Sequence, residues 1–123
     1  MEVVTTITNV EFGKMINAAA DALKNNAEKI NKLNVFPVPD GDTGTNMTLS
    51  MASGAEYERN ETDTHLGALA QATSKGLLMG ARGNSGVILS QIFRGFAGKI
   101  ADKETLTARD LADALMGGAE TAY

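Results

Sequence analysis

The most informative segment of this chain is Phe36-Pro37-Val38-Pro39-Asp40-Gly41-Asp42-Thr43-Gly44-Thr45-Asn46. Residues i and i+2 of an extended segment point to the same side, so Asp40 and Asp42 can converge on one site. Gly41 lets the backbone bend between them, while the two prolines hold the approach extended. Nearby carboxylates repel each other unless a cation or proton intervenes, and Mg²⁺ commonly takes one or two carboxylates together with phosphate oxygens. The segment therefore indicates a divalent cation holding phosphate where a helix begins.

Two other kinds of loop share features with this segment. A Pro-Asp-Gly-Asp sequence also forms ordinary surface turns, and that alternative stays open while the segment is taken alone. A calcium loop is disfavoured, because such a loop needs Gly at its sixth position and Glu at its twelfth. Counted from Asp40, those positions hold Thr45 and Met51.

The composition favours one helical domain. The 123 residues are 43% hydrophobic and only 5% aromatic, with no Trp, which favours closely packed helices over a β-sandwich. The formal net charge of −4 argues against bulk binding of nucleic acid. The absence of Cys excludes disulfides and thiolate zinc sites. No apolar run reaches membrane-spanning length and the N-terminus lacks the apolar core of a signal peptide, so we expect a cytoplasmic protein with no membrane span.

Helical spacing of apolar residues predicts five helices and no strand. The first spans about residues 9–33, the second about 45–57, and the third begins after a polar loop at 58–64. The fourth spans about 85–98, and the fifth begins at the capping sequence Thr107-Ala108-Arg109-Asp110. Met15 lies in the apolar stripe of the first helix, and Ile88 lies in that of the fourth. The chain ends soon after a glycine pair with Tyr123 still on a helical face, so we expect further helices to complete the core.

A second glycine cluster is Gly80-Ala81-Arg82-Gly83-Asn84-Ser85-Gly86, in which Asn84 or Ser85 suits the N-cap of the fourth helix. One interpretation is an ordinary turn between helices. The other is that free N–H groups at 83–86 hold phosphate, with Ser85 donating its hydroxyl and Arg82 adding charge. A Walker A motif is excluded because no Gly-Lys-Ser/Thr follows, and a Rossmann fingerprint is disfavoured because a helical pattern precedes the loop.

Together, residues 33–47 (LNVFPVPDGDTGTNM) and 75–91 (KGLLMGARGNSGVILSQ) resemble the DhaL-type nucleotide-binding domain of dihydroxyacetone kinases. The likeness is greatest to the N-terminal domain of fatty acid kinases, and it covers essentially the whole chain. It implies an all-α fold, an antiparallel barrel of about eight amphipathic helices, of which residues 1–123 would supply about five.

The resemblance also implies a site for ADP or ATP with Mg²⁺. Asp40 and Asp42 match two metal ligands, and Asn34 stands near the place of a third. The implied nucleotide contacts are Thr43, Gly44, Thr45 and Asn46 in the first loop and Asn84 and Ser85 in the second. No catalytic side chain is implied, because phosphoryl transfer depends mainly on positioning and charge neutralisation. The sole histidine, His65, lies away from both loops in the sequence.

The implied reaction is transfer of the ATP γ-phosphoryl group to the carboxylate of a fatty acid, which a separate DegV-type protein carries. Thr43 stands where dihydroxyacetone kinases have His, which favours the fatty acid kinase branch. The alternatives are a dihydroxyacetone kinase (glycerone kinase) subunit, a helical module that holds ADP and Mg²⁺ without turnover, and a structural domain with no ligand. An apolar surface that the further helices would otherwise cover would also favour a homodimer.

Overall fold

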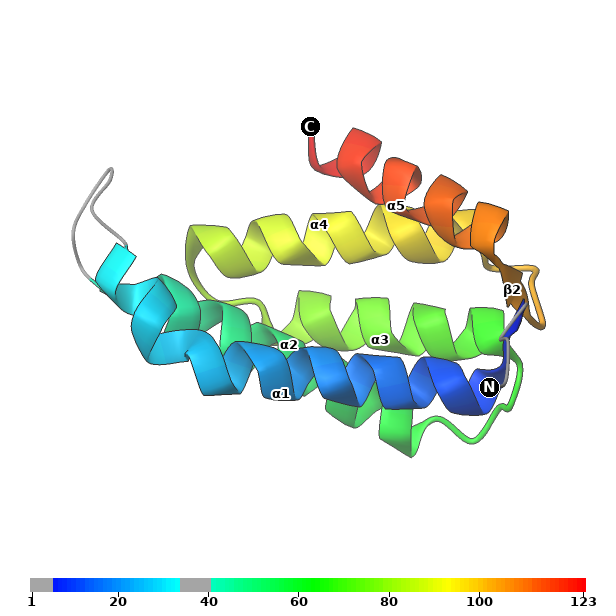
Figure 1. The fold of residues 1–123 in the computed structure, drawn as a ribbon, viewed down its shortest axis with the longest axis horizontal. Coiled ribbons are helices and arrows are strands. Elements are labelled where there is room, and N and C mark those ends of the chain that lie inside the picture. The colour runs from blue at the N-terminus through cyan, green and yellow to red at the C-terminus, as the bar shows by residue number, and fades with distance from the viewer. Residues whose placement is uncertain (1–5, 34–40) are drawn as a thin grey trace, which may run out of the picture.

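The computed structural model describes residues 6–33 and 41–123, which form five helices and a short two-stranded ribbon. Successive helices run in alternating directions (Figure 1). The predicted all-α fold is confirmed. In chain order the elements are β1 (Thr6–Ile7), α1 (Asn9–Leu33), α2 (Thr43–Asn60), α3 (Leu66–Gly80), α4 (Gly83–Lys99), β2 (Leu106–Thr107) and α5 (Ala108–Ala122).

Each helix packs against the next helix in the chain, and α2 also contacts α4. Apolar residues at helical spacing line these contacts, and burying them out of water stabilises the bundle. The buried apolar residues are Phe12, Ile16, Met51, Ala55, Leu66, Leu69, Ala70, Leu77, Phe96, Ala97, Ile100, Leu106 and Ala114. The contact between α2 and α4 matters most for function, because each of these helices begins at one of the two glycine loops.

The two short strands correct the prediction of no strand. Thr6 pairs with Thr107 and Ile7 with Leu106 in an antiparallel ribbon. Two-residue strands are too short to show an alternating pattern, and the pairing joins segments from opposite parts of the chain. The ribbon holds the start of α1 beside the start of α5, at the end of the bundle opposite the glycine loops (Figure 1).

The helix boundaries agree with the sequence prediction for α1 and differ for α2 and α4. α2 begins at Thr43 and reaches Asn60, so the first part of the expected polar loop is helical. α4 begins at Gly83, and its N-cap is Arg82, so the prediction of Asn84 or Ser85 as the cap was wrong. The physical reason is that the N–H of Arg82 is held by a hydroxyl from α2, which ends the loop early.

The predicted cap of α5 is confirmed. The Asp110 N–H donates to the Thr107 hydroxyl over 3.1 Å, and the Thr107 N–H donates to the Asp110 carboxylate over 3.0 Å. This reciprocal pair satisfies two backbone donors that the helix leaves free.

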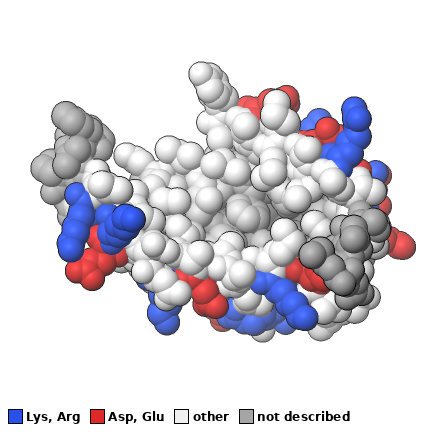
Figure 2. All heavy atoms as spheres, in the orientation of Figure 1, with Lys and Arg blue, Asp and Glu red and all other residues white. Residues whose placement is uncertain are grey.

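Several large apolar side chains remain exposed on the described residues. Met15 is 43% exposed and Ile88 53%, so the apolar stripes of α1 and α4 are not fully covered by the described residues. Both lie within helical stripes that are wider than the contacts between these five helices. Other large apolar residues that are exposed are Val10, Leu33, Leu49, Leu78, Met79, Val87, Leu115, Met116 and Tyr123. Figure 2 shows one face whose centre has no charged side chains, with Lys, Arg, Asp and Glu around its margin.

None of the helices in the described part of the chain combines the length and apolarity needed to cross a bilayer.

Candidate functional site

The two glycine loops meet because α2 and α4 begin side by side, at one end of the bundle (Figure 1). Gly83 has a φ of +66°, a left-handed conformation that other residues adopt only at a cost. A Cβ added to Gly83 would lie 2.5 Å from the Asn46 side-chain nitrogen. The contact between the loops therefore requires glycine at position 83, both for its backbone conformation and for its lack of a side chain.

Ser50 joins the two loops with two hydrogen bonds. Its side chain is fully buried, and its hydroxyl donates to the Asn46 carbonyl over 2.7 Å. The same oxygen accepts the N–H of Arg82 over 3.1 Å, across 32 residues of sequence. One hydroxyl thus holds the residue before α4 against the first turns of α2.

The end of α1 holds the start of α2 from the other side. The Asn31 amide oxygen accepts the Thr45 N–H over 3.1 Å, and its amide nitrogen donates to the Thr45 hydroxyl over 3.0 Å. Gly44 lies against the Ala27 carbonyl and leaves no room for a Cβ. Of the predicted nucleotide contacts, Thr45 therefore has its N–H already engaged, whereas its hydroxyl proton stays available for donation.

Apart from those of Thr45 and Arg82, the first backbone N–H groups at both helix starts have no acceptor among the described residues. Neither the Asp42 nor the Arg82 side chain caps its helix. The first intrahelical bonds begin at the N–H groups of Asn46 and Gly86. Free N–H groups and the helix dipole make a helix N-terminus attractive to anions. The groups left free within the described residues are those of Thr43, Gly44, Gly83, Asn84 and Ser85.

Asp42 is the one predicted metal ligand that the structure describes. It is exposed at the N-cap of α2, and its carboxylate makes no capping hydrogen bond, so its oxygens are free to bind a cation. The other two predicted ligands, Asp40 and Asn34, lie outside the described residues. Within residues 6–33 and 41–123 no three His, Cys, Asp or Glu side chains form a cluster suited to a metal.

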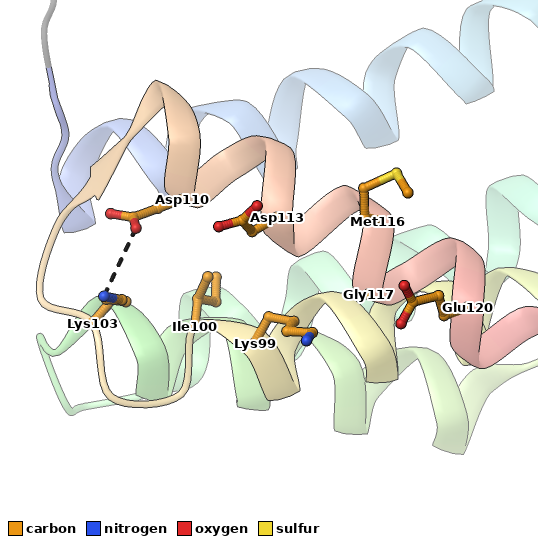
Figure 3. Close-up of a pocket in the computed structure, with 8 residues that line it drawn as sticks. All are labelled: Lys99, Ile100, Lys103, Asp110, Asp113, Met116, Gly117 and Glu120. Carbon is orange, nitrogen blue, oxygen red and sulfur yellow. Dashed lines mark ion pairs between the residues drawn. The ribbon is translucent and has the colours of Figure 1, made fainter.

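A separate cavity of about 350 Å³ lies between the end of α4 and α5, away from both glycine loops (Figure 3). The Lys103 ammonium and the Asp110 carboxylate form an ion pair over 3.8 Å on its wall. The N–H of Thr107 lowers the pKa of the Asp110 carboxyl, and the Lys103 charge adds to that effect. None of the predicted site residues lines this cavity. Its lining residues are Lys99, Ile100, Lys103, Asp110, Asp113, Met116, Gly117 and Glu120.

Comparison with known proteins places the chain in a family. A model of the DAK2 domain matches residues 37–123, which include both glycine loops and the four helices α2 to α5. The chain belongs to the DAK2 domain family. The resemblance to DhaL-type domains is thereby confirmed.

Bacterial proteins of greater length contain close relatives of this DAK2 domain. Protein YloV of Bacillus subtilis is 55% identical over 121 residues, which cover 98% of this chain and 22% of that protein. Uncharacterised proteins of Staphylococcus saprophyticus and Staphylococcus aureus are each 51% identical over 120 residues, with the same coverage of both chains. The DAK2 domain chain therefore spans about a fifth of the length of these relatives.

Sequence reasoning missed Asn31 and Ser50 as residues that shape the site of this DAK2 domain. Neither lies in a glycine loop, and each acts on a partner distant in sequence. Polar residues at single positions in amphipathic helices are common on solvated faces, so the sequence carries no local signal for either. Only the packing of α1 and α4 against α2 brings Asn31 to Thr45 and Ser50 to Arg82.

Proposed function

We propose that this chain is the nucleotide-binding part of an enzyme that transfers the γ-phosphoryl group of ATP with the help of Mg²⁺. The observation that carries the proposal is the pairing of two uncapped helix starts, α2 and α4, through Asn46, Gly83 and Ser50. Two such ends offer converging N–H donors to a polyanion. Membership of the DAK2 domain family supports a nucleotide as that anion.

The predicted contact residues supply phosphate donors and metal ligands in this proposal. The N–H groups at the start of α2, those of Thr43 and Gly44, and those of Asn84 and Ser85 in α4 donate to phosphate oxygens. The Asn46 side chain packs against Gly83 and so joins the start of α2 to the start of α4. Asp42, together with Asp40 and Asn34, would hold Mg²⁺ through oxygen atoms, which are its preferred ligands.

The chemistry needs few protein groups beyond these. Bound Mg²⁺ would neutralise the charge that builds up on the phosphate oxygens. In the reaction, a carboxylate oxygen of the acceptor bonds to the γ-phosphorus as the bond to the β–γ bridging oxygen breaks, and the electron pair leaves with ADP. A fatty acid carboxylate is already ionised at neutral pH, so it needs no general base. This accords with the absence of a predicted catalytic side chain.

We further propose that the acceptor is a fatty acid presented by a DegV-type carrier protein in the cytoplasm. The second candidate is a dihydroxyacetone kinase subunit. Membership of the DAK2 domain family supports this candidate as much as it supports the first. Thr43 favours the first, because the dihydroxyacetone kinase pattern has His there. A third possibility is a module that binds ADP and Mg²⁺ without turnover. Acyl phosphate formation by the full chain with a fatty acid carrier distinguishes the first from both others.

Calorimetric titration of the chain with ADP, with and without Mg²⁺, tests nucleotide binding directly. We expect binding that needs Mg²⁺ and is lost in the double variant Asp40→Asn/Asp42→Asn. Asp21→Asn is the matched control, because Asp21 is exposed on α1 and belongs to neither loop. Equal, Mg²⁺-independent affinity in all three folded proteins would refute the assignment of the metal to the first loop. Absence of any nucleotide binding by the folded 123-residue chain would refute the proposal as a whole.

A further inference from the structure

A second groove, with a cavity of about 550 Å³, lies at the end of the bundle opposite the glycine loops. It runs between the first turns of α1 and the last turns of α2, and the start of α3 closes one side. None of the residues assigned above to nucleotide or metal lines it. Its lining includes Val10, Gly13, Lys14, Asn17, Glu58 and Leu69.

Glu58 is a buried acid in the wall of this groove. The residue is only 7% exposed, yet its carboxylate has no hydrogen-bond or ion-pair partner among residues 6–33 and 41–123. A Cβ added to Gly13 would lie 2.8 Å from Glu58 Oε1. The carboxylate therefore occupies space that exists because position 13 has no side chain. Its oxygens keep some contact with solvent, since the fully buried side-chain atom without a partner among the described residues is Thr48 Oγ1. Burial of the rest of the side chain still weakens the hydration of the carboxylate, so an occupant that donates to it is favoured.

The neighbouring Arg59 does not fill this role. Its guanidinium donates to the Asn17 amide oxygen over 2.8 Å, and the Asn17 amide nitrogen donates in turn to the Gly13 carbonyl over 3.0 Å. Burial raises the pKa of the Glu58 carboxyl, and the Arg59 charge offsets part of that rise. The Arg59 charge thus acts on Glu58 from a distance and leaves the carboxylate oxygens unpaired among the described residues.

The charges around the groove favour a cation over an anion. Three acids line it, Glu58, Glu61 and Asp63, against two bases, Lys14 and Arg59. Because only 7% of Glu58 is exposed, a compact ammonium group reaches its solvent-facing oxygens more readily than a planar guanidinium does, since the guanidinium needs a broad approach. Val10 and Leu69 add apolar wall beside the acid, suited to an aliphatic stem.

We propose that this groove binds a primary alkylammonium group, whose N–H bonds go to the Glu58 carboxylate and whose methylene stem lies along Val10 and Leu69. The site is separate from the nucleotide loops, and the inference does not depend on phosphoryl transfer.

Titration of the full chain with 1,5-diaminopentane, followed by calorimetry and amide NMR shifts, tests the proposal. We expect saturable binding with shifts at Gly13 and Glu58. Affinity should fall about tenfold or more in Glu58→Gln, since a charge-assisted hydrogen bond is lost. Glu56→Gln is the matched control, because Glu56 is exposed on the same helix and lies outside the groove. It should bind as the wild type does.

Two measurements on the wild type keep the proposal testable if Glu58→Gln does not fold. 1,5-pentanediol, which has the same stem without charge, should bind at least tenfold more weakly than the diamine. Diamine binding should also weaken as the pH falls through the pKa of Glu58, because the protonated acid carries no charge. Absence of saturable binding, equal affinity for diamine and diol, or unchanged affinity in a folded Glu58→Gln variant would each overturn the proposal.

Discussion

The Ser50 hydroxyl accepts the backbone N–H of Arg82 over 3.1 Å, and this bond ties the start of α4 to α2. The same hydroxyl donates to the Asn46 carbonyl within α2. A single buried side chain thus sets the distance between the two helix starts that we assign to nucleotide binding.

Ser50→Ala should lower the free energy of unfolding by about 1–2 kcal/mol, because the Arg82 N–H loses its acceptor. It should also weaken ADP binding, since the two loops are no longer held together. Ser53→Ala is the comparison: Ser53 donates to the Gly76 carbonyl and packs against Gly80, but it bonds neither Asn46 nor Arg82. Urea unfolding and calorimetry measure both effects. If both variants bound ADP as the wild type does, Ser50 would have only a structural role.

Gly83→Ala should destabilise the protein by about 1–2 kcal/mol, because the left-handed conformation at φ +66° is strained for alanine and not for glycine. The added Cβ would also press on the Asn46 side chain and weaken ADP binding. Gly98→Ala is the comparison, since Gly98 lies in α4 with nothing within 4 Å of an added Cβ. That change should be neutral or stabilise by up to about 1 kcal/mol. A Gly83→Ala variant as stable as Gly98→Ala would contradict the described loop conformation.

Glu58→Gln should change how stability depends on pH. Burial raises the pKa of Glu58 above its ordinary value of 4.5. At a pH between the ordinary pKa and the folded-state pKa, Glu58 is protonated in the folded protein and ionised in the unfolded chain. The contribution of Glu58 to the free energy of unfolding therefore falls as the pH rises from the ordinary pKa of this group through its folded-state pKa. Relative to wild type, Glu58→Gln should gain stability across that window. Parallel stability profiles of the two proteins between pH 4 and 7, obtained by urea unfolding, would argue that Glu58 is not buried as described.

Thr107→Ala should cost about 1 kcal/mol, because the hydroxyl that accepts the Asp110 N–H is removed from the capping box. Thr105→Ala provides the control, since Thr105 is exposed just before the cap. Thermal unfolding by circular dichroism compares the two. Equal loss in both would mean that the box does not hold the start of α5.

Asp110→Asn tests the other half of the same box through pH. The pKa of Asp110 is lowered in the folded protein, first by the Thr107 N–H, so its contribution is present above the ordinary carboxyl pKa and lost as the pH falls through the folded pKa. Asp110→Asn should therefore flatten the acid side of the stability profile. Asp113→Asn, one turn further along α5, should leave that slope as it is in the wild type.

Much of the helical arrangement could be predicted because its signals are local. Apolar residues at helical spacing mark α1 from residue 9 to 33, and Thr107 with Asp110 marks the start of α5. The ribbon between Thr6–Ile7 and Leu106–Thr107 was missed, since strands of two residues leave no periodic pattern. The cap of α4 was misplaced for a related reason: the bond that ends the loop at Arg82 comes from a distant helix.

The candidate site could likewise be predicted only where its signals are local. Two glycine loops, each followed by a helix, were evident from residues 36–46 and 80–86, because glycine, proline and acidic residues act on the backbone where they stand. That these loops touch could not be derived from either one. The contact of Asn46 with Gly83, the bridge through Ser50 and the hold of Asn31 on Thr45 arise only when α1, α2 and α4 pack together. Neighbouring residues determine the local chemistry of each loop, whereas the convergence of the two helix starts depends on contacts between residues far apart in the chain.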